Sequence, residues 1–151
     1  MVLKTEMSDG VVRLRPLLKR DAKELTQAVQ KSIPELMPWM SWCHQGYSEK
    51  DATQWLNTLP SGWDKGTDFS FAITDIADGQ IVGGCGLSFV NSLFKCGNVG
   101  YWVRSARTGE GIASRSALLV ARFAFEKVGL VRAESVVAGD NQASTRVAEK
   151  V

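Results

Sequence analysis

Residues 107–114 read Arg-Thr-Gly-Glu-Gly-Ile-Ala-Ser and lie between a strand-like run, residues 98–103, and a long helical pattern. The first N–H groups of a helix have no partner within the helix, and the aligned peptide dipoles add partial positive charge at that end. Glycine at positions 109 and 111 would let a ligand approach the main chain without a Cβ in the way. The stretch therefore predicts a phosphate seat at the helix start, although an ordinary tight turn can have the same composition.

The spacing of these glycines excludes two other kinds of phosphate loop. No Lys-Ser or Lys-Thr pair follows them, as a nucleoside-triphosphate loop requires. No third glycine and no acidic residue at a strand end follow, as a dinucleotide-binding fingerprint requires. The phosphate predicted here would belong to another type of ligand.

Three blocks in chain order carry a resemblance to a known family. They read Gly100-Tyr101-Trp102-Val103, Thr108-Gly109-Glu110-Gly111-Ile112-Ala113 and Asp140-Asn141-Gln142-Ala143-Ser144. Together they resemble the GCN5-related N-acetyltransferase (GNAT) superfamily and, within it, the RimJ/RimL branch of ribosomal-protein N-terminal acetyltransferases. The likeness runs from about residue 11 to residue 151.

The phosphate-binding pattern of that family is Gln/Arg-x-x-Gly-x-Gly/Ala. It falls here on Thr108, Gly111 and Ala113, so the first position departs from the pattern, and the adjacent Arg107 is a candidate for the missing donor. The resemblance implies acetyl-CoA as the acetyl donor. Its pyrophosphate would lie over the amides of Gly109, Glu110, Gly111, Ile112, Ala113 and Ser114.

The resemblance also implies where the rest of the donor lies. The pantetheine arm would fit between the strand ending at Val103 and a strand at 133–138, where splayed strands expose unpaired main-chain groups. Asn141 would be a hydrogen-bond partner of the CoA arm, and by its residue type it is also a helix cap.

Acetyl transfer needs a neutral amine, a donor for the oxyanion and a proton for the departing thiolate. The resemblance places the oxyanion donor at a main-chain N–H near Trp102 or Val103. Most of the superfamily protonates the thiolate with a tyrosine in the last helix, but no tyrosine follows Tyr101 here. The spacing Asn141-x-x-Ser144 matches the branch in which a serine takes that role, so Ser144 is the predicted general acid, with an exposed helix serine as the alternative.

The sequence leaves the general base open. A protein α-amine has a pKa of about 8, so a water relay would suffice. Glu134 is expected on a strand near the cleft, where a solvated edge or an ion pair is its simpler role. His44 is the only histidine and could reach the substrate side, but a single histidine is more often structural or exposed.

Residues 33–42 contain two prolines and two tryptophans, which predicts an irregular loop or a broken helix. Buried packing is one interpretation of Trp39 and Trp42. The other is a wall of the substrate cleft, where the related enzymes place this segment.

The composition of the chain, 151 residues of which 44% are hydrophobic and 23% charged, is typical of one soluble globular domain. A net charge of +2 without a dense Lys/Arg cluster argues against a nucleic-acid partner. No apolar run reaches the length of a signal peptide or a membrane span. Three cysteines without C-x-x-C spacing predict reduced thiols in a cytoplasmic protein, with neither a disulfide frame nor a metal site.

The hydrophobic periodicity predicts the elements that must position these residues. Strands are expected at 11–15 (an edge strand), 69–74, 81–90, 98–103 and 133–138. One helix is expected at 22–29, and a second runs from a capping box at 48–51 to a break at 60–66. A third helix runs from 111 to about 127, and a last one begins at 140 or 141. Glycines 83, 84 and 86 in the return strand predict a bulge, or another chain or a ligand passing close to it. The helix from 111 is expected to be buried except for Arg115, Arg122 and Glu126.

The expected fold class is α/β, with the GNAT fold: a mixed, mostly antiparallel twisted sheet flanked by helices. The resembling family has two further strands after its final helix, so this single domain, residues 1–151, is expected to be short at its C-terminus. The strand at 133–138 would then present an open apolar edge, which predicts low solubility or a homodimer.

The function that these observations favour is an acetyl-CoA-dependent N-acetyltransferase acting on a primary amine, with a protein N-terminus of the ribosomal-protein type among the acceptors. Acetylation of a small amine or amino acid is one alternative, and a non-catalytic CoA-binding module is another. Residues 33–47 would decide the acceptor, and their sequence does not name one.

Overall fold

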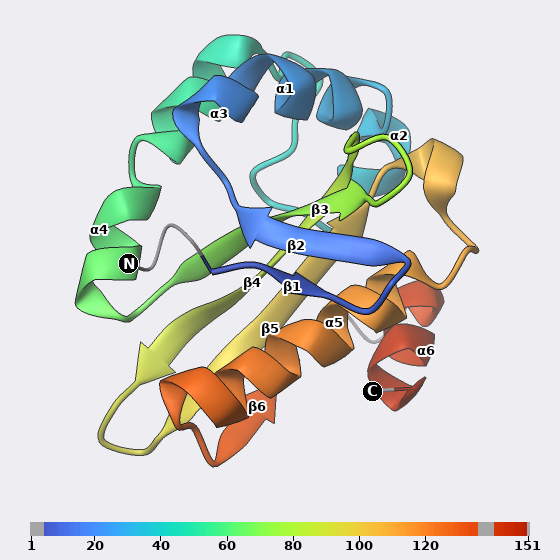
Figure 1. Cartoon of the computed structure of the whole chain (residues 1–151). Helices are drawn as coiled ribbons and strands as arrows, with labels where there is room; N and C mark the ends of the chain where they lie inside the picture. Colours follow the sequence, from blue (N-terminus) through green and yellow to red (C-terminus); the bar gives the residue numbers. More distant parts are fainter. Residues whose placement is uncertain (1–4, 136–140, 151) are drawn as a thin grey trace.

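A six-stranded sheet forms the centre of the protein, and the computed structural model describes residues 5–135 and 141–150 (Figure 1). The strands follow one another in chain order across the sheet, and all neighbours are antiparallel except β5 and β6, which are parallel. Their bounds are β1 Met7–Ser8, β2 Val12–Pro16, β3 Phe69–Asp75, β4 Ile81–Asn91, β5 Cys96–Val103 and β6 Arg132–Glu134.

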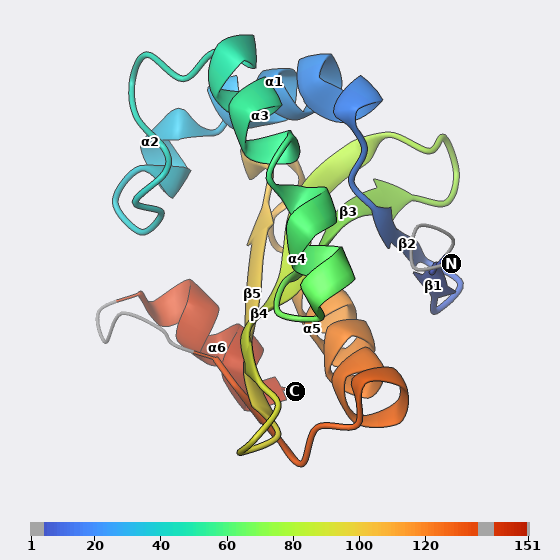
Figure 2. The same cartoon turned by 90° about the vertical axis from the view of Figure 1, so that its left-hand side faces the viewer.

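Helices cover both faces of this sheet, so the fold is the α/β arrangement that the periodicity predicts (Figures 1 and 2). The helices α1 and α3 lie over one face, and α5 lies over the other, with α6 beside it. The helix bounds are α1 Ala22–Gln30, α2 Ile33–Leu36, α3 Glu49–Leu56, α4 Leu59–Lys65, α5 Ile112–Phe123 and α6 Gln142–Lys150.

Alternation along the strands separates two apolar clusters. Leu14 and Phe71 are fully buried on the face that α5 covers, where they pack with Val120. Ala72, one residue further along β3, belongs to the cluster beneath α1 and α3. A period of two therefore sends neighbouring residues of one strand into different cores, which fixes the register of the sheet.

Two sequence predictions about element boundaries are wrong. The strand at 11–15 is not at the edge, because Met7 and Ser8 pair with it as a further short strand. Residues 60–66 do not break the helical region but form most of α4, since Pro60 lies in the first turn, where the missing N–H costs nothing. That helix ends at Gly66 in a left-handed conformation, with φ of 70°.

The helix α5 is less completely buried than its composition predicts. Leu118 and Phe125 are 43% and 46% exposed, so the solvated face extends beyond the three charged residues expected there. The α-helix gives way to a π-helical turn at Ala124–Val128 and ends at Gly129, whose φ is 83°. The predicted glycine stop is confirmed, and the exposed apolar side chains were not expected.

At the other edge of the sheet, β6 pairs only with β5 among the described residues. Residues 136–138 of the strand predicted at 133–138, and Asp140 at the predicted helix start, lie outside those residues. Pairing of two copies at this edge stays a prediction. Within the described residues, every helix is too short or too polar to span a bilayer.

Candidate functional site

The glycine loop before α5 has the geometry of an anion seat. Gly109 and Gly111 adopt φ angles of 80° and 79°, and a Cβ added at either position would meet open space. Gly111 is the N-cap of α5, and no side chain caps the helix there. The free N–H groups of the first turn, from Ile112 to Ser114, therefore open on a space that a ligand can enter.

Arg107 fastens this loop to the sheet. Its Nε atom lies 2.9 Å from a Glu110 carboxylate oxygen, and its Nη2 atom lies 2.9 Å from Oδ2 of Asp75 at the end of β3. Hydrogen bonds to Glu110 and Asp75 raise the pKa of Arg107 above its ordinary value. The side chain expected as a phosphate donor is thus held by two carboxylates. Thr108, the residue that differs from the family pattern, stays within the loop, where its hydroxyl donates to the Ser105 carbonyl at 3.1 Å.

The strand β5 loses its parallel neighbour half-way along its length. The last pair between β5 and β6 is Asn98 with Glu134, and five residues of β5 follow it, from Val99 to Val103. On its other side β5 stays paired with β4 up to Val103. One edge of β5 is therefore open beyond residue 98 within the described part of the chain.

Two hydrogen bonds show which residues face that open edge. Val131 N–H donates to the Lys95 carbonyl on the β6 side, and Arg104 N–H donates to a carbonyl of β4. Main-chain groups alternate between the two sides of a regular strand, and β5 pairs with β4 without a register shift from residue 98 to residue 103. The N–H and C=O groups of Tyr101 and Val103 consequently point to the open edge.

The N–H and C=O groups of Trp102 point the other way, toward β4, where Trp102 pairs with Gly84. Its indole lies so close to Gly84 that a Cβ there would be 2.6 Å from Nε1. At Gly86, an added Cβ would lie 2.5 Å from the Phe69 carbonyl. The register of β3 and β4 shifts beside Gly83, so the bulge predicted there is confirmed. The atoms close to Gly84 and Gly86 belong to this chain.

Tyr101 brings a hydroxyl to the open edge of β5. Its Oη atom donates to the Ser144 carbonyl at 2.9 Å and lies 3.1 Å from Ser144 Oγ, where either oxygen can donate. The Asn141 side chain accepts from the N–H of Ser144 at 3.2 Å and so caps α6, as its residue type predicts. A strand residue and a helix residue, 43 positions apart in sequence, thus form one hydroxyl pair.

A cavity of about 750 Å³ lies between the sheet and the helices α1 and α3, and it reaches Tyr101 and Ser144 at one end. Its floor contains a cross-strand row of Ser70, Gly86 and Gly100 from β3, β4 and β5. Two of these three residues have no side chain, so the floor is low at that point.

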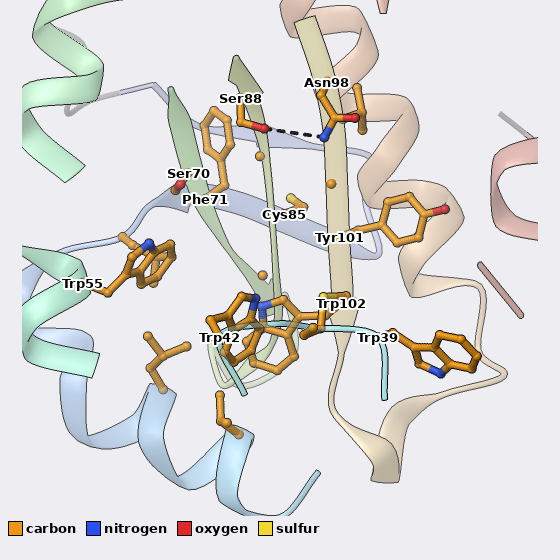
Figure 3. A pocket seen from close by; sticks show the side chains of 18 of the residues that line it. Trp39, Trp42, Trp55, Ser70, Phe71, Cys85, Ser88, Asn98, Tyr101 and Trp102 are labelled. Atoms are coloured by element: carbon orange, nitrogen blue, oxygen red, sulfur yellow. Dashed lines mark hydrogen bonds between the residues drawn. The ribbon is translucent and has the colours of Figure 1, made fainter. Parts of the chain in front are cut away.

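Tryptophans form much of the cavity wall (Figure 3). Trp39 and Trp42 both line it and are 41% and 42% exposed, so the interpretation that they are buried in a core is wrong. Trp42 and Trp102 have ring centroids 5.9 Å apart, and Trp55 adds a further ring from α3. The cavity wall thus also includes Trp102, which the sequence proposed only for its main chain, and Trp55, which the sequence did not single out.

The two candidate bases lie outside this arrangement. Glu134 is exposed and pairs with Arg132 at 2.9 Å, which is the simpler role expected for it. His44 does not line the cavity, and its Nε2 atom lies 3.4 Å from Asp51 Oδ2. Burial raises the pKa of the Cys85 thiol in the cavity floor, so Cys85 stays protonated and is a poor nucleophile.

The family model for the acetyltransferase (GNAT) domain matches residues 12–151 of the chain. The chain belongs to the GNAT acetyltransferase family. It is an N-acetyltransferase. The cavity floor, the open edge of β5 and the glycine loop are thus parts of a GNAT domain.

Solved structures with the same fold include three ribosomal-protein acetyltransferases. RimJ of Mycobacterium smegmatis, in complex with CoA-disulfide, is 29% identical; the match covers 93% of this chain and 68% of that one, with a TM-score of 0.85. RimL, the ribosomal L7/L12 α-N-protein acetyltransferase in complex with coenzyme A, is 20% identical over 97% of this chain and 82% of that one, at a TM-score of 0.86. The ribosomal-protein-S5-alanine acetyltransferase of Vibrio fischeri is 20% identical; the match covers 97% of this chain and 81% of that one, with a TM-score of 0.84.

Sequence reasoning missed Tyr101 as a chemical group of this site. Tyr101 stands in a quoted block, but it was passed over because the tyrosine was expected in the last helix. The period of two along β5 puts its side chain on the face opposite to Trp102, and only the position of α6 shows that the phenol meets Ser144.

Proposed function

We propose that this GNAT enzyme transfers the acetyl group of acetyl-CoA to the primary amine of a protein N-terminus, of the kind that ribosomal proteins carry. The observation that carries the proposal is the Tyr101–Ser144 hydroxyl pair at the open edge of β5. The RimL and RimJ structures, both complexes with CoA species, support the choice of donor and of acceptor class.

The residues present fit a CoA molecule. The amides of residues 109–114 would hold the pyrophosphate, because they open on free space and no side chain caps them. The main-chain groups of Tyr101 and Val103 would pair with the amides of the pantetheine arm, as a neighbouring strand would. Asn141 lies at the end of that path and lines the cavity with Ser144.

Acetyl-CoA supplies an activated thioester, and two chemical tasks then fall to the protein. The first is to stabilise the oxyanion. Of the two predicted donors, Val103 is the one whose N–H faces the open edge, so we assign the task to Val103. Trp102 contributes its ring to the acceptor side.

The second task is to protonate the departing thiolate. Ser144 keeps its proposed part in this step, and Tyr101 joins it. A phenol is a stronger acid than an aliphatic alcohol, and Tyr101 can draw a replacement proton from Ser144 across 3.1 Å. We assign proton donation to the pair. The acceptor amine would reach the thioester from the cavity.

The experiment is an acetyl-CoA consumption assay with release of the free CoA thiol as the readout. Peptides with a free N-terminus should be acetylated once, at the α-amine, as shown by the mass gain of one acetyl group. The same peptides with a blocked N-terminus and a free lysine serve as the control and should stay unmodified. Turnover of the blocked peptides at the same rate would contradict the proposal.

A small amine as acceptor is a second candidate, because the cavity has a volume of about 750 Å³ and an aromatic wall. Free amino acids and small amines tested in the same assay separate the two. Turnover of small amines without turnover of peptides would assign the cavity to a small molecule. CoA binding without turnover of any amine would make the chain a binding module.

A further inference from the structure

The far end of the cavity, on α3, has a composition of its own. Asp51 and Trp55 are four positions apart and so lie on the same face of α3, where both line the cavity. Asp51 is the only charged side chain among the described residues of the lining, which includes no lysine and no arginine. The one charge that the cavity offers is therefore negative.

Described residues contact only one of the two oxygens of the Asp51 carboxylate. Its Oδ2 atom accepts from the Ser48 N–H at 2.9 Å and from the Ser48 hydroxyl at 3.2 Å, and it lies 3.4 Å from His44 Nε2. No described residue donates to Oδ1, and 36% of the side chain is exposed. The Ser48 N–H, followed by the Ser48 hydroxyl and His44, holds the pKa of Asp51 below its ordinary value, so the carboxylate is charged at neutral pH.

Aromatic rings line the same cavity as this carboxylate. Trp42, Trp55 and Tyr47 line the same cavity, and the rings of Trp42 and Tyr47 lie 5.9 Å apart at an interplanar angle of 63°. Indole faces carry negative electrostatic potential and attract cations. A carboxylate with exposed indoles beside it is a suitable environment for a positively charged group.

We take that group to be distinct from the amine that reacts. A nearby carboxylate stabilises an ammonium ion and so opposes the loss of the proton that attack requires. Figure 3 shows Trp55 and Tyr101 on opposite sides of the cavity, with Trp42 and Trp102 between them. The α3 end is therefore separated from the hydroxyl pair at which the acetyl group is transferred.

We propose that Asp51, Trp42 and Trp55 form a second acceptor subsite, which takes a positively charged side chain of the acceptor while its neutral amine lies at Tyr101. The preferred acceptor then has a guanidinium or ammonium group within a few residues of the amine that is acetylated. This inference rests on the proposed function, because it uses the same cavity for the acceptor.

The test compares two series of short peptides that differ only by arginine or citrulline at the second or third position. Citrulline keeps the shape of arginine and has no charge. The wild-type enzyme should show a kcat/KM about tenfold higher for at least one arginine peptide than for its citrulline twin. In the variant Asp51→Asn this preference should fall to about twofold or less, while the citrulline peptide keeps its rate.

Two further variants separate recognition from folding. Glu49→Gln removes the same charge from the exposed side of α3 and should keep the preference for arginine. Trp55→Leu should lower the rate for arginine peptides more than for citrulline peptides. An asparagine at position 51 still offers an oxygen to the Ser48 N–H, so the helix start is preserved, and a thermal melt checks this.

The outcomes distinguish the two proposals. Equal rates for arginine and citrulline peptides, or a preference that survives Asp51→Asn, would overturn the subsite and leave the proposed function standing. If no peptide is acetylated but a small diamine is, with a rate that depends on Asp51, the protein acceptor is wrong and the subsite stands. Rates that fall equally for both peptides in Asp51→Asn would assign Asp51 to the helix cap alone and overturn the subsite.

Discussion

The glycine loop and the aromatic cavity are built in opposite ways. The loop consists of neighbours in sequence, and its working groups are main-chain amides that glycines leave uncovered. The cavity gathers side chains from α1, α3, the segment after α2 and three strands, and its floor depends on glycines of β4 and β5. In the proposed function, one region would bind through the backbone of a single turn, and the other through side chains that distant elements bring together.

This difference predicts different responses to mutation. A backbone site is insensitive to most side-chain changes and is lost when a side chain is placed where none fits. A side-chain site can be altered stepwise, because each wall residue contributes a part of the contact. We propose that the loop binds the donor and the cavity binds the acceptor. Mutations in the loop should therefore change the affinity for CoA, and mutations in the cavity should change the KM for the amine.

The largest effect is expected for Gly111→Glu. It forces a side chain onto a residue with φ of 79° and places a carboxylate where the pyrophosphate would bind, so CoA affinity should fall by about a thousandfold or more. Isothermal titration calorimetry measures this. The matched control is Gly79→Glu in the β3–β4 turn, where φ is 73° and the space is equally open. Unchanged affinity in Gly111→Glu would remove the loop from CoA binding.

The next effect concerns the hydroxyl pair between the two regions. Tyr101→Phe and Ser144→Ala should each lower kcat, by about a hundredfold for the tyrosine, and leave the Kd for CoA unchanged. If the two hydroxyls act as one relay, the double variant should be no worse than Tyr101→Phe alone. A kcat at the wild-type level in Tyr101→Phe would exclude the phenol from proton transfer.

Gly100→Val probes the cavity without touching the loop. An added Cβ at this position meets only Asn98 Nδ2 at 4.0 Å, so the chain should fold while the cavity floor rises. KM for bulky acceptors should increase about tenfold, with the Kd for CoA unchanged. The neighbouring change Gly86→Val should instead lower the melting temperature, because its Cβ would clash with the Phe69 carbonyl. A weaker CoA affinity in Gly100→Val would show that donor and acceptor share this floor.

The smallest effect is expected where the loop is fastened to the sheet. Asp75→Asn removes one partner of Arg107 and should weaken CoA binding about threefold if Arg107 acts by holding the loop. Arg107→Lys should behave in the same way. If Arg107 instead reaches the phosphate, Asp75→Asn should free its guanidinium and strengthen binding, and Arg107→Lys should weaken binding far more. Calorimetry with CoA distinguishes the two roles.

Local patterns predicted much of the fold because they report local physics. The capping box before α3 is visible in the sequence and forms through the Asp51 side chain. The glycine stop at Gly129 likewise needs only its own φ angle. Pro60 was misjudged, since a proline can begin a helix as well as end one, and its neighbours alone did not decide between these.

The proposed donor side of the site rests on local patterns of the same kind, and the proposed acceptor side does not. The residue types at 109–114 and the spacing from Asn141 to Ser144 lie within single elements. Asp51 and Trp55 gave the signals of an ordinary helix, a cap and an apolar stripe. Their place in the same cavity as Trp42 depends on how α3 packs over the sheet.

By itself the sequence determined most of the strands and helices, the glycine turn that opens α5 and the family to which the chain belongs, because each follows from the order of neighbouring residues. Only the tertiary structure decided that Tyr101 meets Ser144, that no described residue of β6 pairs with β5 beyond Asn98, and that one carboxylate faces a tryptophan-lined cavity. Those relations join residues tens of positions apart. They depend on the register of the sheet and on the placement of helices over it, which no local pattern records.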